Sequence, residues 1–308
     1  MIVLFYHLIS PREPPHLRPL YRCKSPRAFA ADLRFLKNRR RILSHDEVVE
    51  YLEAGRPLPP DSVLLTFDDG YRECFTEVRP LLLEHRVPAV FFVPSALVGN
   101  RRLAYRNAAA LALSRLNRLP RRRLGGPLRR LEALLDSPLP GRPAAAAALR
   151  GLGPGDGEIL ARACRELGVD PDEYLSRRRP YLEEEEVRRL AADGFTIGGH
   201  SRLHTPLDGL GEAELEEEIV GSTRAVLKLS GQARAPFAFP FAGFRAPADL
   251  LARLLERYVF LTLVFGGPET GNPRLISRRL WADTPAGTGG RRTNLPRLLK
   301  EFERPDSL

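Results

Sequence analysis

The stretch Ser62-Val-Leu-Leu-Thr-Phe-Asp-Asp-Gly70 joins a short apolar run to two adjacent carboxylates and a glycine. Residues 62–67 have the length and composition of a buried β-strand, and the polar residues that follow are typical of a strand end. We therefore predict a strand over residues 62–67 that delivers Asp68 and Asp69 to its carboxyl end.

Strands and helices are predicted to alternate on either side of this stretch. Further short apolar runs predict strands over residues 2–6, 89–93, 195–197, 237–241 and 258–265. Helix signals lie between them: Ser25-Pro26, the capping-box pair Ser44 and Glu47, and helical spacing over residues 78–85, 183–192 and 212–229. Because strands that alternate with helices imply a parallel sheet or barrel, the predicted fold class is α/β.

The paired carboxylates Asp68 and Asp69 are the first candidates for chemistry. Two like charges at short range resist joint ionisation, and a bound cation would remove that conflict. One carboxylate could then ligate a metal ion while its neighbour takes a proton from water. A solvated Asp-Asp-Gly turn is the alternative interpretation of the same residues.

A second candidate is His200-Ser-Arg-Leu-His204, which follows Gly198-Gly199. Two imidazoles four residues apart can bind one metal ion, and imidazole with carboxylate suits zinc, iron, cobalt or nickel. The alternative is a pair of surface or hydrogen-bonded histidines, although the chain has only 6 histidines in all. The two glycines would allow close approach of the backbone. Together the paired carboxylates and the two histidines supply three ligands and a base, and the carboxyl ends of parallel strands converge on one face.

Taken in order, these segments resemble the polysaccharide-deacetylase family of NodB-type carbohydrate esterases. Residues 66–70 are similar to the family's T-F-D-D-G motif, residues 200–204 to its H-[ST]-x-x-H motif, and residues 237–241 (Phe-Ala-Phe-Pro-Phe) to the F-A-Y-P-[YF] form of its third motif. The resemblance covers residues 1–100 and 181–245 and implies a distorted (β/α) barrel, whereas residues 101–180, which it leaves unexplained, are predicted from their composition to be a helical insertion. One catalytic domain would span residues 1–308 and be interrupted by an insertion over residues 101–180.

The resemblance also implies a reaction and a role for each matched residue. The ligands of a divalent metal ion, with zinc favoured over cobalt, nickel or iron, would be Asp69, His200 and His204. Asp68 would be the general base, and the backbone at Pro240 and Phe241 would stabilise the oxyanion. The implied activity removes N-acetyl groups from an amino-sugar-containing glycan or glycolipid and releases acetate. Two alternatives stay open: hydrolysis of another amide or ester, such as an O-acetyl ester or a cyclic imide, and glycan binding without catalysis.

The general acid needs a separate argument, because ordinary members of the family use a late histidine and this chain has none after His204. The N-terminal run Leu4-Phe-Tyr-His7 resembles the Tyr-His motif of a subgroup whose repeat order is circularly permuted. In that subgroup the histidine after the first strand supplies the acid. The resemblance therefore assigns His7 to protonate the departing amine, with a core or turn histidine as the alternative.

The third motif departs from the family pattern, because it lacks the arginine that usually orients the base. The late segment Ile276-Ser-Arg-Arg-Leu-Trp281 makes Arg278 or Arg279 the candidate for that role. Trp281, the only tryptophan, could stack on a sugar ring or be a half-buried structural residue. Phe241-Ala-Gly243 has one residue more than the family's usual form, which predicts a shifted oxyanion loop.

Residues 101–180 interrupt the α/β pattern and contain 17 arginines, no lysine and only eight acidic residues. Since the whole chain has a net charge of +10, nearly all of the excess belongs to this segment. We predict helices near residues 108–116 and 157–167, in an insertion that covers one end of the sheet as a lid. Its charge indicates an acidic glycan, a phosphate-bearing carrier lipid or an anionic membrane surface as a neighbour, although a solvated arginine-rich surface explains it equally well. Few aromatic residues and no recognition motif argue against a nucleic-acid partner.

Composition narrows the class of protein further. A hydrophobic content of 43% and a charged content of 28% are ordinary for a globular protein and exclude a disordered or fibrous chain. No apolar run is long enough for a transmembrane helix, and the first residues lack the features of a signal peptide. The three cysteines are far apart and are expected to be small buried residues in a reducing compartment. We expect a cytoplasmic protein, at most peripheral to the inner membrane surface, and no feature points to a particular sugar or oligomeric state.

Overall fold

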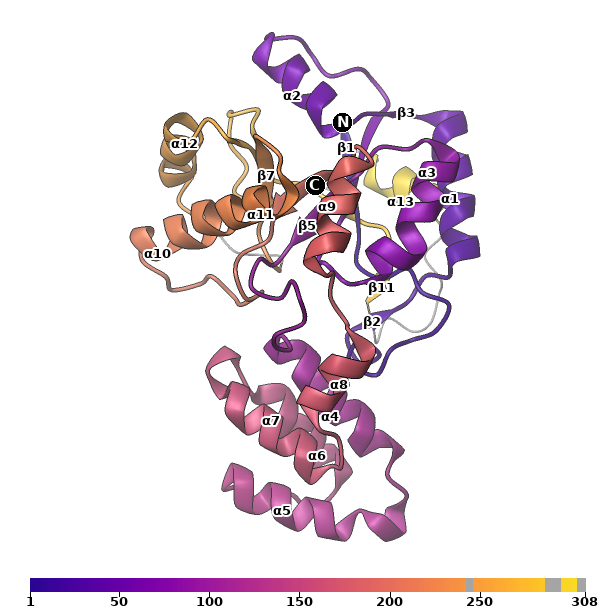
Figure 1. The fold of residues 1–308 in the computed structure, drawn as a ribbon, viewed down its shortest axis with the longest axis vertical. Coiled ribbons are helices and arrows are strands. Elements are labelled where there is room, and N and C mark those ends of the chain that lie inside the picture. The colour runs from indigo at the N-terminus through magenta and orange to yellow at the C-terminus, as the bar shows by residue number, and fades with distance from the viewer. Residues whose placement is uncertain (242–245, 286–294, 304–308) are drawn as a thin grey trace.

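A parallel β-sheet curled into an open barrel forms the centre of the molecule (Figure 1). The computed structural model describes residues 1–241, 246–285 and 295–303. Among these residues the strand order is β10-β1-β4-β5-β6-β7-β8-β9, with β3 paired to β4, and the strand pairs of this sheet are parallel. The strands are β1 (Ile2–Tyr6), β3 (Arg41–Ile42), β4 (Ser62–Phe67), β5 (Val90–Val93), β6 (Thr196–Gly199), β7 (Ala235–Ala238), β8 (Leu261–Phe265), β9 (Leu275–Ile276) and β10 (Leu280–Trp281). A separate antiparallel pair joins β2 (Tyr21–Arg22) to β11 (Thr284–Pro285).

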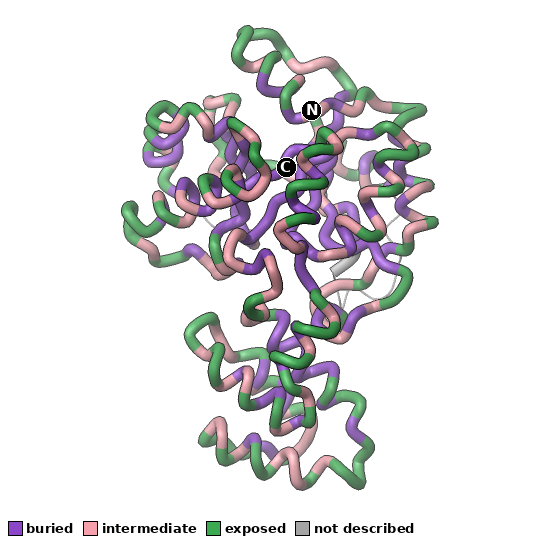
Figure 2. Tube along the Cα trace, viewed as in Figure 1, coloured by how far each residue is buried: buried purple, intermediate pink, exposed green. Residues whose placement is uncertain are grey.

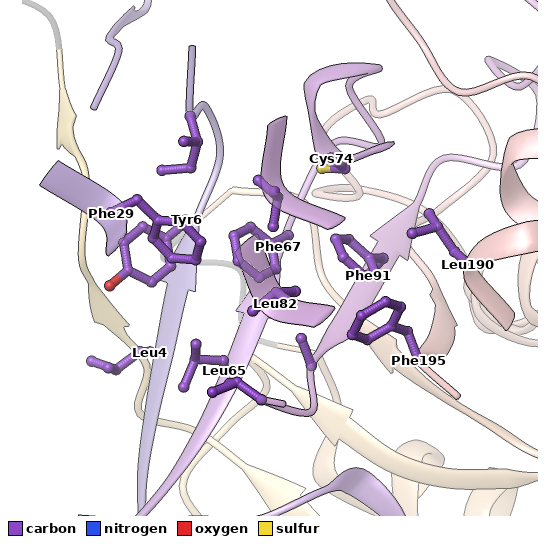
Figure 3. Packing of buried hydrophobic residues seen from close by; sticks show 14 of the residues in the cluster. Leu4, Tyr6, Phe29, Leu65, Phe67, Cys74, Leu82, Phe91, Leu190 and Phe195 are labelled. Carbon is purple, nitrogen blue, oxygen red and sulfur yellow. The ribbon is translucent and has the colours of Figure 1, made fainter. Parts of the chain in front are cut away.

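Helices cover the outer face of the sheet through two apolar clusters. Against β1, β4, β5 and β6 lie α1 (Pro26–Arg39), α3 (Arg79–His85), α9 (Glu184–Ala192) and α11 (Ser222–Ser230). In Figure 3, Phe67 and Phe91 lie at the centre of this cluster, with Phe29 and Leu190 contributed by the helices. Against β7 and β8 lie α10 (Glu212–Glu216) and α12 (Ala248–Arg257). Full burial of each large apolar side chain stabilises the fold by about 1.5–3 kcal/mol.

The inner face of the barrel is also apolar, and one of its ends is closed. Leu64 and Phe92 belong to the interior cluster, whereas their neighbours in sequence Leu65 and Phe91 belong to the outer one, as the alternation of a strand requires. Side chains of α2 (His45–Glu53) join the interior cluster. Because α2 lies beside the N-terminus in Figure 1, it covers the amino ends of the strands and leaves the carboxyl ends for polar groups.

Local signals in the sequence produce the predicted helix ends. Ser25 accepts a backbone hydrogen bond in the first turn of α1, and Ser44 and Glu47 form a reciprocal capping box at α2. Gly194 and Gly231 follow α9 and α11 with φ of +89° and +74°, which glycine adopts without strain. The predicted alternation of strands and helices is therefore confirmed together with its local causes.

The predicted third-motif strand is shorter than expected. The sequence predicts a strand over residues 237–241, but β7 (Ala235–Ala238) ends at Ala238. Pro240 has no N–H to continue the ladder, and Phe241 takes a left-handed φ of +63°. The chain therefore leaves the sheet just before the residues predicted to form the oxyanion site.

Two other boundaries also differ from the prediction. The strand predicted over residues 258–265 begins only at Leu261, because the Tyr258 N–H still bonds to the end of α12. The helix predicted over residues 212–229 exists, but a π-helical turn at Glu217–Gly221 separates α10 from α11. A second π-helical turn, at Cys74–Val78, precedes α3.

The arginine-rich segment forms a helical bundle with its own core, which projects from the carboxyl end of the barrel (Figure 1). Its helices are α4 (Tyr105–Arg118), α5 (Gly125–Leu135), α6 (Arg142–Gly151), α7 (Gly157–Glu166) and α8 (Pro171–Arg178). Figure 2 shows buried residues inside the bundle and exposed residues along its outer surface. The helices predicted near residues 108–116 and 157–167 are confirmed as α4 and α7. The bundle projects away from the barrel and is not a flat layer across the end of the sheet.

Two of the three cysteines are packed among apolar side chains. Cys74 is buried in the outer barrel cluster and Cys164 in the core of the bundle, while Cys23 is half-buried. Burial of two of the three agrees with the prediction. Within the described part of the chain, no helix is both long and apolar enough to cross a bilayer.

Candidate metal centre and active site

Asp69, His200 and His204 come together at the carboxyl end of the barrel. Asp69 is the second residue after β4, and His200 follows β6 directly, with β5 between these two parallel strands. One ligand-type atom from each residue lies within 4.8 Å of the others. Asp69 Oδ1 is 2.9 Å from His204 Nε2 and 3.5 Å from His200 Nε2. All three predicted ligands are buried in one place.

The chemistry of these atoms fits a metal ion. His200 Nδ1 is 2.8 Å from the carbonyl oxygen of Ala238, which can only accept, so Nδ1 carries the proton and Nε2 keeps its lone pair. Asp69 Oδ1 is buried without an aligned hydrogen-bond donor among the described residues, although both imidazoles are close. Burial opposes its ionisation, but His204 and His200 hold the pKa of Asp69 well below its usual range. An ionised, unsatisfied carboxylate oxygen beside an imidazole lone pair is a donor set that a cation would complete.

Two glycines bring the histidine loop close to its neighbours. A Cβ at Gly198 would lie 2.6 Å from the Phe92 ring and 2.8 Å from the carbonyl oxygen of Pro236. At Gly199 it would lie 2.7 Å from Thr223 Oγ1. Contacts this short are not tolerated, so only glycine allows β6 to pass here, as the sequence predicted.

Left-handed backbone conformations cluster around the predicted ligands. Such conformations cost about 1–3 kcal/mol in a non-glycine residue and persist only where the surrounding structure enforces them, typically at active sites. The four that surround this centre are Asp69 (φ +71°), Ser201 (+59°), His204 (+54°) and Phe241 (+63°).

Arg279 fixes the orientation of Asp68. Its Nη1 and Nη2 donate to Oδ2 and Oδ1 of Asp68 at 2.9 and 2.6 Å, and Nη2 also donates to Thr66 Oγ1 at 2.8 Å. Bidentate pairing of this kind adds geometric precision to the ionic attraction. Of the two arginines that the sequence offered, Arg279 makes this contact, whereas Arg278 lies over the ring of Phe302 at 4.7 Å.

His7, at the end of β1, is held by Asp283, a residue that the sequence prediction missed. His7 Nδ1 is 3.1 Å from Asp283 Oδ1, and Oδ2 accepts hydrogen bonds from the backbone N–H groups of His7 and Leu8 at 2.6 and 2.8 Å. Burial opposes the charged imidazole, but the Asp283 carboxylate outweighs it and raises the pKa of His7 to about 9. The same pairing lowers the pKa of Asp283 against the effect of burial. At neutral pH His7 therefore carries the proton that a general acid needs.

Tyr21 is a second residue that the sequence prediction missed. Its hydroxyl donates to Asp69 Oδ2 at 3.1 Å, and its ring stacks on His7 at 4.5 Å. Trp281 lies on the same histidine, with ring centres 4.8 Å apart, and its indole N–H donates to Asp283. These contacts favour a structural interpretation of Trp281 over sugar stacking. Tyr21 and Asp283 lie outside the quoted motifs, so only their three-dimensional contacts identify them.

Phe241 lies against the centre. Its ring meets that of His204 edge-on at 4.7 Å, and the guanidinium of Arg106 from α4 lies over it at 4.2 Å. Pro240 and Phe241 thus reach the same place as the predicted ligands. The extra residue predicted for this loop, at Ala242-Gly243, lies outside the described residues.

Comparison with known proteins adds an independent line of support. The chain matches the family model described as polysaccharide deacetylase over residues 55–122 and 158–259, which is more than half of its length. The unmatched residues 123–157 lie inside the predicted insertion. A poly-beta-1,6-N-acetyl-D-glucosamine N-deacetylase of Escherichia coli K12 is 44% identical over 45 residues, which cover 15% of this chain and only 7% of that relative.

Solved structures share the fold at low sequence identity. IcaB from Ammonifex degensii is 19% identical, with 90% of each chain covered and a TM-score of 0.53. A de-N-acetylase from Aggregatibacter actinomycetemcomitans is 15% identical, with 91% of this chain and 94% of that one covered and a TM-score of 0.53. Deacetylase PplD of Streptococcus pyogenes is 15% identical, with 86% and 82% covered and a TM-score of 0.52. These likenesses confirm the predicted barrel type. The match to the family model over more than half of its length shows that the chain belongs to the polysaccharide deacetylase family.

Proposed function

We propose that this chain is a metal-dependent hydrolase that removes N-acetyl groups from an amino-sugar-containing glycan or glycolipid and releases acetate. Family membership supports a deacetylase. The short match to a relative named for a polymer of N-acetyl-D-glucosamine supports an amino sugar as the acetylated group.

The observation that carries the proposal is that an oriented carboxylate, a set of three candidate metal ligands and a protonated imidazole lie close together. The buried carboxylate Asp68 is oriented by Arg279 beside Asp69 and the two histidines. His7 is linked to the same place through Tyr21, which stacks on it and bonds to Asp69, and its raised pKa of about 9 keeps the imidazole protonated at neutral pH. Hydrolysis of an amide needs a base for the water and an acid for the nitrogen, and we assign these roles to Asp68 and His7.

Asp69, His200 and His204 would hold the metal ion. One carboxylate and two imidazoles suit zinc, with cobalt, nickel or iron as alternatives. When bound, the ion would supply Lewis-acid chemistry by polarising the acetyl carbonyl and making water more acidic. A set of three protein ligands leaves coordination positions free, as catalytic rather than structural sites do.

The surrounding residues would divide the proton transfers between them. Asp68 takes a proton from the water whose oxygen forms the new bond to the acetyl carbon, and the N–H of Phe241 donates to the developing oxyanion. His7 gives its proton to the nitrogen as the carbon–nitrogen bond breaks. The products are acetate and a free amine, and each proton transfer contributes about 10²–10⁴-fold to the rate.

Acetate release from a panel of N-acetylated glycans tests this proposal. The protein is stripped with a chelator and reconstituted separately with zinc, cobalt, nickel and iron. We expect at least one glycan to release acetate, with loss on chelation and recovery with one metal. Acetate from an O-acetyl ester alone, or hydrolysis of a cyclic imide, would favour another amide or ester hydrolase. Glycan binding without release from any substrate would indicate a non-catalytic relative.

Asp68→Asn is the most informative variant, because it keeps the size of the side chain and leaves the three ligands intact. We expect metal binding, measured by calorimetry, to persist while turnover falls about 10²–10⁴-fold. Asp208→Asn, at an exposed loop position, is the matched control and should retain activity. Normal turnover by Asp68→Asn would remove Asp68 as the base.

The surface of the bundle supports peripheral contact with an anionic membrane or carrier lipid. Exposed arginines whose side chains have no partner among the described residues are Arg102, Arg118, Arg121, Arg122, Arg123, Arg129, Arg150 and Arg162. Each cationic side chain near an anionic membrane contributes about 1 kcal/mol. Co-sedimentation with anionic but not with neutral vesicles is expected, and equal recovery with both would contradict membrane contact.

A further inference from the structure

Arg106, in the first turns of α4, places a cation beside the candidate metal centre. Its guanidinium carbon lies 4.2 Å from the centre of the Phe241 ring, and that ring is 4.7 Å from the His204 ring. A single aromatic side chain therefore separates this cation from a proposed metal ligand. The helical bundle thus supplies a charged group to the rim of the site.

The hydrogen bonds of Arg106 leave its outer edge unused. Nε donates to the Tyr105 hydroxyl at 3.1 Å, and neither Nη atom has an acceptor among the described residues. Stacking on Phe241 and the bond to Tyr105 hold the plane of the guanidinium in place. The free edge is the side of an arginine that pairs with the two oxygens of a carboxylate or phosphate.

A cleft of about 430 Å³ lies between the bundle and the loop that carries His204, and its lining includes Tyr105, whose hydroxyl accepts the hydrogen bond from Arg106. Leu203 and Thr205, on either side of His204, line one wall, and Arg102 and Tyr105 line the α4 side. Arg102 is exposed and has no partner among the described residues. The volume is within the range of small-molecule sites, so a sugar ring and its substituents have room here.

The described acidic residues that line the same cleft form no ion pairs with Arg102 or Arg106. Asp172 is paired with Arg165 at 2.9 Å and is therefore already satisfied. Glu158 lies on α7 and forms no ion pair with Arg102 or Arg106 within the described residues. The cations of the α4 side thus remain available to a ligand.

We propose that Arg106, supported by Arg102 in the cleft, binds an anionic group that the substrate carries next to its acetylated sugar. The group is a carboxylate or a phosphate, because these planar or tetrahedral sets of oxygens match the free edge of the guanidinium. This inference rests on the proposed function and narrows its substrate class to anionic glycans or sugar phosphates. Arg106 is then a specificity-determining residue for the reaction.

Three N-acetylated substrates test the inference and identify the source of the charge. They are a neutral N-acetylglucosamine disaccharide, a disaccharide in which a uronic acid neighbours N-acetylglucosamine, and a nucleoside diphosphate N-acetylglucosamine. We expect kcat/KM for one anionic substrate to exceed that for the neutral one by about ten-fold or more, as the gain from a hydrogen bond between charged groups implies. The preference should decline as salt is added. Release of acetate with no preference for either anionic substrate would refute the inference alone, whereas no acetate from any glycan would refute the proposed function.

Variants separate recognition by Arg106 from a structural role. Arg106→Gln should bring the anionic-to-neutral ratio of kcat/KM close to one, chiefly through KM, and Arg106→Lys should retain part of it because it keeps the charge without the fork. Arg122→Gln, at an exposed arginine of the bundle that has no partner among the described residues, is the matched control and should keep the ratio. An unchanged ratio in Arg106→Gln, or equal losses on neutral and anionic substrates, would refute the assignment.

Discussion

Replacement of Arg279 tests the ion pair that orients the proposed base. Arg279→Met keeps an unbranched apolar side chain and removes the guanidinium, whereas Arg279→Lys keeps the charge and removes the fork. The guanidinium makes three hydrogen bonds of 2.6–2.9 Å, two to Asp68 and one to Thr66. Both variants should therefore lose activity, but only Arg279→Met leaves the buried carboxylate without a counter-charge.

The size of the effect follows from the burial of the pair. Only 8% of the Arg279 side chain and 5% of the Asp68 side chain are exposed. Removal of one partner from a buried pair costs about 3–5 kcal/mol, because the other charge has neither water nor a counter-ion. Arg279 Nε has no acceptor among the described residues, so part of its desolvation is not offset in the wild type. We therefore expect the loss of stability in Arg279→Met at the lower end, about 3 kcal/mol, with kcat reduced about 10²-fold by misplacement of the base.

Urea unfolding and acetate release measure the two effects, and a double-mutant cycle with Asp68→Asn isolates their common cause. Once the charge of Asp68 is removed, Arg279→Met should cost less, with a coupling energy of about 0.5–3 kcal/mol. Arg278→Met is the matched control, since that arginine contacts Phe302 and should leave kcat unchanged. Additive losses of stability, or wild-type kcat in Arg279→Met, would refute the assigned role of the pair.

Three further perturbations address other parts of the site. Asp283→Asn removes the carboxylate that raises the pKa of His7 to about 9. Because the proposed acid His7 can give a proton only while it is protonated, the alkaline limb of the kcat/KM profile should move to lower pH. A cation at the neighbouring ligands would lower this pKa by like-charge repulsion, so the wild-type limb should lie below about 9, and an unmoved limb in Asp283→Asn would contradict the pairing. His204→Ala should weaken zinc binding in calorimetry and abolish the rise in Tm that zinc produces, and equal affinity would exclude His204 as a ligand. Gly198→Ala places a Cβ 2.6 Å from the Phe92 ring and should lower the free energy of unfolding by about 1–3 kcal/mol. Gly151→Ala, whose Cβ would meet open space, is the control and should not. Equal urea midpoints for the two variants would show that the Phe92 ring can move aside.

The part of the site that could be predicted depends on local sequence. Asp68, Asp69 and His200 lie immediately after apolar strands, so a residue's position relative to its own strand is enough to place it at the carboxyl end. Parallel pairing then brings these ends together, because β4 and β6 lie on either side of β5. The same reasoning places His7 at the end of β1. The position of each residue at the end of its own strand, together with the parallel pairing of the strands, therefore accounts for most of the centre.

The part that could not be predicted depends on contacts between distant residues. Asp283 bonds to His7 across 276 positions of the sequence, and Tyr21 reaches Asp69 from a two-residue strand. Strands of two residues carry no periodic pattern, so the sequence gives no signal for them. The sequence could not decide between Arg278 and Arg279 for the same reason. The decision depends on the pairing of Leu280 with Leu4, which is a contact between distant residues.

The curvature of the sheet explains why Arg279 reaches the candidate centre. β9 and β10 are the two ends of the strand order, and seven spacings in a flat sheet would separate them by about 33 Å. The chain between Ile276 and Leu280 can span at most about 14 Å, so the sheet must curl until its ends approach one another. Arg279 lies in this short connection, and its guanidinium passes over Phe5 at 4.5 Å on its way to Asp68. The same three-residue link that forces the barrel to curl therefore carries the side chain that fixes the proposed base, and lengthening the link would loosen both.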